Sequence, residues 1–246
     1  MFPKRSTIEG YAPRTLLRRL IGGERDAGES VERHSTVMFT DITGFTKLAE
    51  TLSPSATARF LTAHFRALAR CIEGERGTVG KILGDGLLAY WDGGEVAAPA
   101  LRSALAIRSA VTTDNRARSR AGLVPIRLRV GLHAGPLVMA RLGAARSLGL
   151  TPLGDTVNVA SRMETSAPAG SIQVSKRTAR RLEPLYALSS CAPVALRGLG
   201  PVTTYLLEGR KPELEEDAFP RARNARSNVV ELARSWSRSG EEGRAI

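Results

Sequence analysis

The chain has 246 residues, 42% of them hydrophobic, which suits one domain of ordinary size with extensions and excludes disorder along its whole length. No stretch approaches the roughly 18 unbroken apolar residues that span a bilayer, and the start MFPKRSTIEG lacks the apolar run of a secretory signal. We therefore expect a cytoplasmic protein with little membrane contact. The two cysteines, Cys71 and Cys191, are too few for a disulfide framework or a zinc cluster.

The net charge of +12 raises the question of a polyanionic partner. Residues 1–30 hold six basic against four acidic residues, and residues 210–246 hold eight against seven. Most of the excess therefore falls on residues 31–209. A site for a triphosphate could use this charge, although ordinary surface arginine accounts for most of it.

Residues 1–30 predict an N-terminal extension with one short amphipathic helix. Within TLLRRLIGG, four apolar residues share a helical face and two arginines lie opposite. Packing against the core or a partner subunit is the plainer interpretation, because attachment to an anionic membrane usually needs a longer basic face.

The following segments predict a β-α-β-β-α-β order. His34–Thr40 is a β-branched and aromatic run typical of a strand, and it ends at Asp41. After it we expect a helix from Ser53-Pro54 to Gly74, strands Thr78–Leu83 and Leu87–Trp91 joined across Gly84-Asp85-Gly86, a helix over Glu95–Ser119 and a strand in IRLRVGLHAG. This order is that of a ferredoxin-like α+β fold.

Beyond this core, the segment LVMARLGAARSLGL predicts a hairpin arm, and Asp155–Ser166 predicts a helix. Three more strands are expected near residues 171–174, 185–197 and 202–208. From Arg210 onward the apolar content falls and charges alternate, so residues 210–246 predict a charged tail or weak helix.

Two aspartates are the first candidates for chemistry. In the predicted order the first strand lies beside the hairpin of the next two, so Asp41 and Asp85 can converge at one end of the sheet. Two carboxylates there would suit Mg²⁺, which takes its other ligands from phosphates and water. Each motif alone has an ordinary explanation, since aspartate often caps a turn and Asp-Gly is a common hairpin dipeptide.

The segment between the first strand and its helix is a candidate phosphate site. Backbone N–H groups of residues 42–45 would point at phosphate oxygens from the positive end of a helix, and Gly44 permits a close approach.

Asn158 and Arg162 are a second pair of candidates. They stand four residues apart in the predicted helix, so their side chains share one face. An arginine can neutralise charge that moves across a phosphate, and an asparagine can hydrogen-bond a ribose oxygen. Alternatively, Arg162 is a solvated helix residue and Asn158 is a weak helix former.

The blocks FTDITGFT, KILGDGLLA and LGDTVNVASRME, together with LRVGLHAGP, resemble the signature of the class III adenylate and guanylate cyclases. The resemblance runs in order through residues 33–208, so we expect one catalytic domain over residues 31–209 with the nucleotide cyclase fold. It implies a head-to-tail homodimer in which each site takes its metal aspartates from one chain and Lys81, Thr151, Asn158 and Arg162 from the other.

The resemblance also implies a role for each matching residue. Asp41, Ile42 and Asp85 would hold two ions of Mg²⁺ or Mn²⁺; Gly44, Phe45 and Thr46 would adjoin the triphosphate; Asn158 and Arg162 would stabilise the transition state; Arg197 would also reach the triphosphate. The Arg197 match covers few residues, and Leu199 stands where the family often has a second lysine. Triphosphate contacts are therefore fewer than usual or come from another arginine.

Substrate choice follows from two further positions of the resemblance. Lys81 and Thr151 stand where adenylate cyclases of this class have Lys and Asp or Thr, and where guanylate cyclases usually have Glu and Cys. A lysine can donate to adenine N1, and a threonine hydroxyl can accept from the 6-amino group. Lys81 is one of five lysines against thirty-one arginines, although a surface lysine is the ordinary explanation.

These residues predict an adenylate cyclase that binds ATP and converts it to 3',5'-cyclic AMP and pyrophosphate. The alternatives are a guanylate cyclase, a catalytically weak nucleotide-binding module of the same fold, and a basic domain that binds nucleic acid. Inactive modules generally lose a metal aspartate or the Asn/Arg pair, and all four residues are present here. We expect no nucleic-acid partner.

Overall fold

The computed structural model describes residues 31–93, 97–142, 149–196 and 200–211. The expected N-terminal helix and almost all of the expected C-terminal tail lie outside these residues. The described elements are β1 (Val31–Ile42), α2 (Phe45–Glu50), α3 (Pro54–Gly74), β2 (Thr78–Leu83), β3 (Gly86–Asp92), α4 (Ala97–Arg120), β4 (Leu128–Leu142), β5 (Gly149–Leu153), α5 (Asp155–Ser166), β6 (Ile172–Ser175), α6 (Lys176–Leu182), β7 (Tyr186–Leu196) and β8 (Gly200–Arg210).

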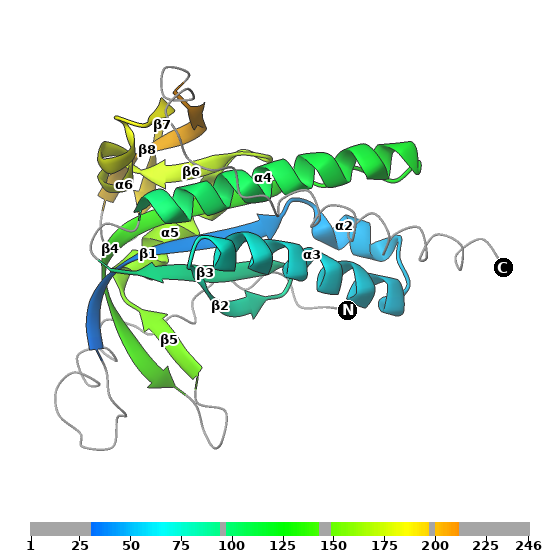
Figure 1. The fold of residues 1–246 in the computed structure, drawn as a ribbon, viewed down its shortest axis with the longest axis horizontal. Coiled ribbons are helices and arrows are strands. Elements are labelled where there is room, and N and C mark those ends of the chain that lie inside the picture. Colours follow the sequence, from blue (N-terminus) through cyan, green and yellow to red (C-terminus); the bar gives the residue numbers. More distant parts are fainter. Residues whose placement is uncertain (1–30, 94–96, 143–148, 197–199, 212–246) are drawn as a thin grey trace.

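One mixed sheet organises the described part of the chain, with strand order β2-β3-β1-β4-β6-β8-β7 and with β5 paired to β4 (Figure 1). The first four strands in this order, with α3 and α4, have the predicted ferredoxin-like arrangement. β1 is antiparallel to both β3 and β4, and β2 is antiparallel to β3. Consequently β1 and β2 run in the same direction and end at the same edge of the sheet. The α+β fold class is confirmed.

Helices cover both faces of this sheet. The larger core joins α3 and α4 to one face, through residues such as Phe60, Leu68, Leu101 and Ile107. A smaller core lies on the other face, where Val157 and Ala160 of α5 pack against β1, β3 and β4. Because side chains alternate along a strand, odd-numbered residues at the end of β1 point toward the face that α5 covers.

The expected strand at Ile126 begins two residues later, at Leu128. The backbone of Ile126 is engaged elsewhere: the Asn115 side chain donates to its carbonyl at 2.7 Å and accepts from its amide at 2.8 Å.

Helix α6 was not predicted from the sequence. It has seven residues, and only Ala179 and Leu182 supply its apolar side, so the periodic signal is short.

α5 lies unusually close to β4 because of a glycine. A Cβ atom added at Gly131 would lie 2.0 Å from the Glu164 amide nitrogen and 2.5 Å from the Ala160 carbonyl oxygen. Any side chain at this position would therefore push the helix off the sheet.

Among the helices of the described residues, none combines the length and the apolar character needed to cross a membrane.

Candidate functional site

Asp41 and Asp85 lie at the edge where β1 and β2 end. Asp41 is the penultimate residue of β1, and Asp85 stands in the turn between β2 and β3. A Cβ atom at Gly86 would lie 2.6 Å from the Thr40 carbonyl oxygen and 3.7 Å from Asp41 Oδ1, so this turn is in close contact with the end of β1. The two aspartates therefore come together, as the predicted strand order requires.

Arg129 on β4 is a third charged group at this edge. It is the direct cross-strand partner of Asp41, and its Nη2 donates to Asp41 Oδ2 at 2.5 Å. Both side chains are largely shielded, with 18% and 17% of their surfaces exposed. Arg129 was not among the site residues predicted from the sequence. The sequence shows that Arg129 stands two residues before a glycine in LRVGLHAG. This spacing does not indicate which strand pairs with it.

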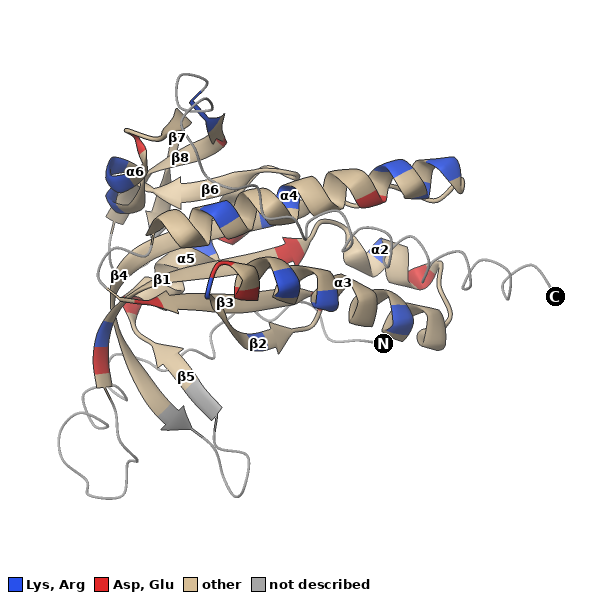
Figure 2. Ribbon diagram, viewed as in Figure 1, with Lys and Arg blue, Asp and Glu red and all other residues tan. Residues whose placement is uncertain are grey.

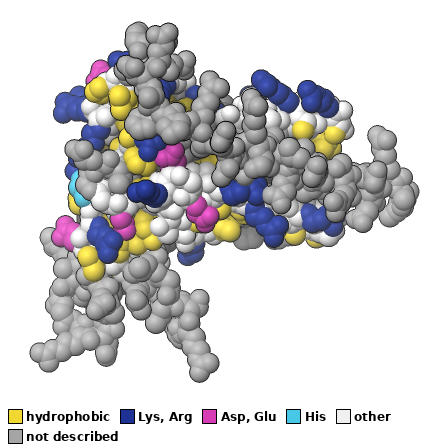
Figure 3. Space-filling model, in the orientation of Figure 1, with side chains coloured by type: hydrophobic (Ala, Val, Ile, Leu, Met, Phe, Trp, Pro, Cys, Tyr) yellow, Lys and Arg dark blue, Asp and Glu magenta, His cyan; other side chains and the backbone are white. Residues whose placement is uncertain are grey.

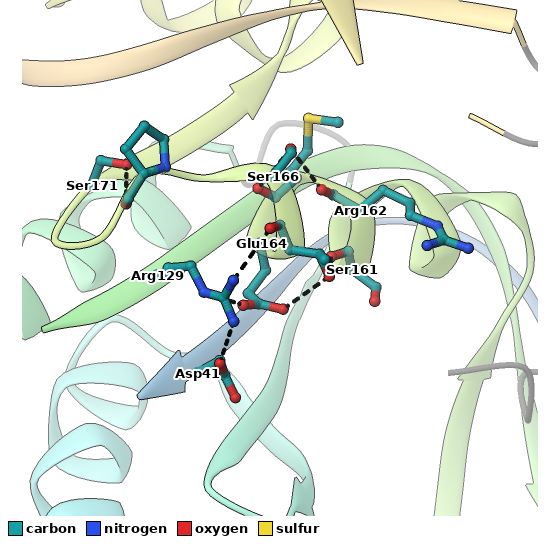
Figure 4. Close-up of polar contacts among 10 residues, drawn as sticks. Asp41, Arg129, Ser161, Arg162, Glu164, Ser166 and Ser171 are labelled. Carbon is teal, nitrogen blue, oxygen red and sulfur yellow. Dashed lines mark hydrogen bonds and ion pairs between the residues drawn. The ribbon is translucent and has the colours of Figure 1, made fainter. Parts of the chain in front are cut away.

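Glu164 completes this group from the opposite side (Figure 4). Its Oε1 lies 3.2 Å from Arg129 Nε, and Arg129 Nη1 donates to the Thr165 carbonyl at 3.3 Å. Burial on its own would lower the pKa of Arg129, but the hydrogen bond to Asp41 and the charges of Glu164, Asp41 and Asp85 raise it. Glu164 was also missed, because a glutamate near the end of a helix is ordinarily solvated.

The charges of this group favour added cations. Three carboxylates, those of Asp41, Asp85 and Glu164, act on one guanidinium, so the group by itself carries an excess of two negative charges. Among the described residues, no three His, Cys, Asp or Glu side chains are arranged to hold a metal. Two aspartates nevertheless suit Mg²⁺ or Mn²⁺, which take their remaining ligands from phosphate and water. The Ile42 side chain is aliphatic and buried, so this residue can join them only through its backbone carbonyl.

The predicted phosphate segment directly follows Asp41. Gly44 adopts φ 74° and ψ 20°, a left-handed conformation that glycine tolerates, and α2 begins at Phe45. Phe45 stacks on Phe60 with ring centroids 6.1 Å apart, which ties the start of α2 to α3. Thr46 is exposed. The first amides of a helix have no acceptor within the helix, so this turn can offer N–H donors beside the aspartates.

Asn158 and Arg162 share the exposed face of α5, as predicted. Figure 4 shows that the Arg162 side chain points away from Arg129 and Asp41. A single chain thus brings the two aspartates together but does not bring Arg162 to them.

Lys81 is exposed on β2, next to the irregularity in the β2–β3 pairing between Val79 and Lys81. Thr151 is half-buried on β5, opposite Ala140 of β4. β2 and β5 contact each other, so both residues lie on neighbouring strands of one chain. Arg197 falls outside the described residues.

Charges elsewhere are dispersed. Basic residues mark α6 and the outer end of α4, while an acidic position marks the end of β1 (Figure 2). On the face drawn in Figure 3, basic side chains form several separate groups among acidic and uncharged ones.

The family described as "Adenylate and Guanylate cyclase catalytic domain" matches residues 29–209. The chain is 35% identical over 163 residues to adenylate cyclase 1 of Rhizobium meliloti, with 64% of this chain and 24% of that protein covered. It is 31% identical over 220 residues to guanylate cyclase 2G of Mus musculus, with 84% and 19% covered. The structure resembles that of the adenylyl cyclase CyaB from P. aeruginosa, with a TM-score of 0.70, 27% identity, and 76% and 99% covered. The chain thus spans about a quarter or less of the length of these two curated relatives.

Proposed function

Because the chain belongs to the family of adenylate and guanylate cyclase catalytic domains, we propose that it is an adenylate cyclase that converts ATP to 3',5'-cyclic AMP and pyrophosphate. The observation that carries this proposal is the meeting of Asp41 and Asp85 at one edge of the sheet, in a group with excess negative charge. That arrangement suits a reaction that needs divalent cations beside a polyphosphate.

In this proposal the chain's own residues bind and orient ATP. Asp41, Asp85 and the Ile42 carbonyl hold Mg²⁺ or Mn²⁺. The amides near Gly44, Phe45 and Thr46 donate to the triphosphate. If bound there, these ions would supply Lewis-acid stabilisation of the oxygens that carry charge during an in-line displacement at the α-phosphorus. Arg129, which lies beside Asp41, supplies a further triphosphate contact in this proposal, and Arg197 remains a candidate for another.

We further propose that each active site is shared between two chains of a head-to-tail homodimer. Within one chain Arg162 points away from Asp41, which supports a site that another copy completes. A second chain would bring Asn158 and Arg162 to the α-phosphate, where they neutralise charge as the bond to pyrophosphate breaks. It would also bring Lys81 and Thr151 to the base.

Lys81 and Thr151 support ATP over GTP. An ammonium beside the base can donate to adenine N1, whereas guanine presents its own N1–H there. The Thr151 hydroxyl can accept from the adenine 6-amino group, and guanine carries an oxygen at that position. Both enzyme types occur among the relatives, so residue chemistry rather than similarity selects the substrate.

Chromatographic analysis of products after incubation with Mn²⁺ and either nucleotide tests this proposal. We expect cyclic AMP and pyrophosphate from ATP, with GTP turned over much more slowly. An Asp41→Asn protein, which keeps the size of the side chain, serves as the matched control for contaminating activity. Faster formation of cyclic GTP would make the chain a guanylate cyclase, and no cyclic product from either nucleotide would overturn the assignment of catalysis.

A further inference from the structure

The Arg129 guanidinium is held from two sides by different elements. On one side Nη2 donates to Asp41 on β1 at 2.5 Å. On the other, Nε lies 3.2 Å from Glu164, and Nη1 donates to the Thr165 carbonyl at 3.3 Å, both on α5. Only 7% of the Glu164 side chain is exposed, so this ion pair is shielded from water and from salt.

The backbone around Glu164 has little freedom to move away from Arg129. Gly131 lies two residues from Arg129 on β4, and therefore on the same face of the sheet. A Cβ atom at Gly131 would approach the Glu164 amide nitrogen to 2.0 Å and the Glu164 Cα to 2.7 Å. The helix therefore rests directly on the strand at the point where the Glu164 carboxylate meets the guanidinium.

The same helix presents a different face to solvent. Arg162 lies only two residues before Glu164, but it points outward and away from Asp41 (Figure 4). Asn158 shares that outward face. Neighbours in sequence on α5 are thus directed to opposite sides of the helix.

We propose that Glu164 is a positioning residue for the metal-binding half of its own chain: it anchors the Arg129 guanidinium on α5 so that cations can bind Asp41, although it lies on the helix whose outer face serves the partner's site. This inference rests on the proposed function, because it assumes that the two halves of a site come from different chains. It assigns Glu164 to the group of Asp41 rather than to that of Arg162.

The physical reason is competition for Asp41. Divalent cations that bind this carboxylate must displace or share the guanidinium. With Glu164 present, the guanidinium retains a partner when it leaves Asp41. Without the Glu164 charge, it pairs more strongly with Asp41 and opposes cation binding.

Mixed dimers test which half-site Glu164 serves. The Glu164→Gln homodimer should lose activity by about 10- to 100-fold, the usual effect of removing a residue that orients a metal site. Mixed in equal amounts with an Arg162→Ala protein and allowed to exchange subunits, it should form dimers with one wholly intact site. Since half of the dimers are mixed and each has one of two sites intact, activity should recover to about a quarter of wild type.

The same Glu164→Gln protein mixed with Asp41→Ala should show no such recovery, because both changes damage the metal-binding half. Recovery with Asp41→Ala instead of Arg162→Ala would assign Glu164 to the outer face of α5 and overturn the inference. Recovery with neither partner, or with both, would also overturn it. An Asp41→Ala and Arg162→Ala mixture is the control: if that mixture fails to recover despite subunit exchange, the shared site itself is wrong.

Calorimetric titration with Mn²⁺ gives a readout that does not depend on turnover. Glu164→Gln should bind Mn²⁺ about tenfold or more weakly than wild type. In an Arg129→Ala background, the same substitution should cause no further weakening, because there is no guanidinium left to hold. Additional weakening there would mean that Glu164 acts by its charge alone, against the inference.

Glu183→Gln, which removes the same charge from an exposed position at the end of α6, should bind Mn²⁺ as wild type does. Glu164→Asp keeps the charge and should retain part of the Mn²⁺ affinity. It is the variant to compare with wild type if Glu164→Gln proves unstable.

Discussion

Asp41 and Arg129 are direct partners across the β1–β4 ladder, and a guanidinium nitrogen lies 2.5 Å from an Asp41 carboxylate oxygen. One positive charge therefore already occupies a carboxylate that we propose to hold divalent cations. Cations and guanidinium compete for the same oxygens, and Glu164 supplies the guanidinium with a second anchor. The state of this pair thus links β1, β4 and α5 to metal binding.

Removal of either metal aspartate should abolish turnover without unfolding the chain. Asp41→Ala and Asp85→Ala each remove a proposed ligand of ions that stabilise the reacting oxygens. Initial rates with ATP and Mn²⁺ measure the loss, and gel filtration checks the folded state. Asp92→Ala, which removes an aspartate paired with Arg33 and Ser35 on β1, should keep its turnover. Retention of more than about a tenth of activity in Asp41→Ala or Asp85→Ala would contradict the assignment.

Exchange of the two base-reading residues should change nucleotide preference. Lys81→Glu with Thr151→Cys should lower kcat/KM for ATP and shift relative preference toward GTP, because mispaired donors and acceptors cost about 1–3 kcal/mol each. The ratio of kcat/KM values for the two nucleotides measures the shift. Lys176→Glu, at an exposed lysine on α6, should leave that ratio unchanged. An unaltered ratio in the double variant means that these residues do not contact the base.

A methyl group at Gly131 should displace α5 from the sheet. The added Cβ would lie within 2.7 Å of three backbone atoms of α5, and backbone cannot move aside as a flexible side chain can. Gly131→Ala should therefore lower the free energy of unfolding by at least about 1–3 kcal/mol, measured by urea denaturation, and should reduce turnover strongly. Gly209→Ala is the matched control, since a Cβ there meets no atom within 4 Å, and it should change stability by less than about 0.5 kcal/mol. Equal stability of the two variants would contradict the close packing of α5 on β4.

The buried His64 should make the protein less stable in acid. Burial, and secondarily the charge of Arg118, lowers the pKa of His64 from 6.5 to about 4. The imidazole of His64 is therefore protonated near pH 6.5 in the unfolded chain, but only near pH 4 in the folded chain. Stability contributed by the neutral imidazole is complete above pH 6.5 and is lost as pH falls toward 4, by up to about 3 kcal/mol.

His64→Phe should weaken this pH dependence. The imidazole stacks on Phe60, with centroids 5.8 Å apart, and meets the edge of Phe65 at 5.6 Å, so an aromatic ring suits the position. Urea denaturation of both proteins at pH 7 and pH 4.5 gives the comparison. Parallel losses of stability in the two proteins would show that His64 does not titrate on unfolding.

Local sequence patterns determined most of the elements of this fold. The predicted helix Asp155–Ser166 has the bounds of α5, and the helix predicted from Ser53-Pro54 begins at Pro54 with Ser53 as its cap. Helical periodicity, capping residues and turn glycines act over a few neighbouring residues, so they can be read without the fold. Helix α6 was not predicted, because two apolar residues in a seven-residue helix make no periodic pattern.

The sequence predicted that Asp41 and Asp85 meet, because the predicted strand order brings the ends of the parallel strands β1 and β2 to one edge. It could not identify Arg129 or Glu164 as members of the same group. The first depends on the β1–β4 register, which sets Arg129 opposite Asp41, and a shift of one residue would turn it to the other face. The second depends on which side of α5 lies on Gly131. Register and helix rotation are set by packing between segments far apart in the chain, so only the tertiary structure decided how these charges are paired.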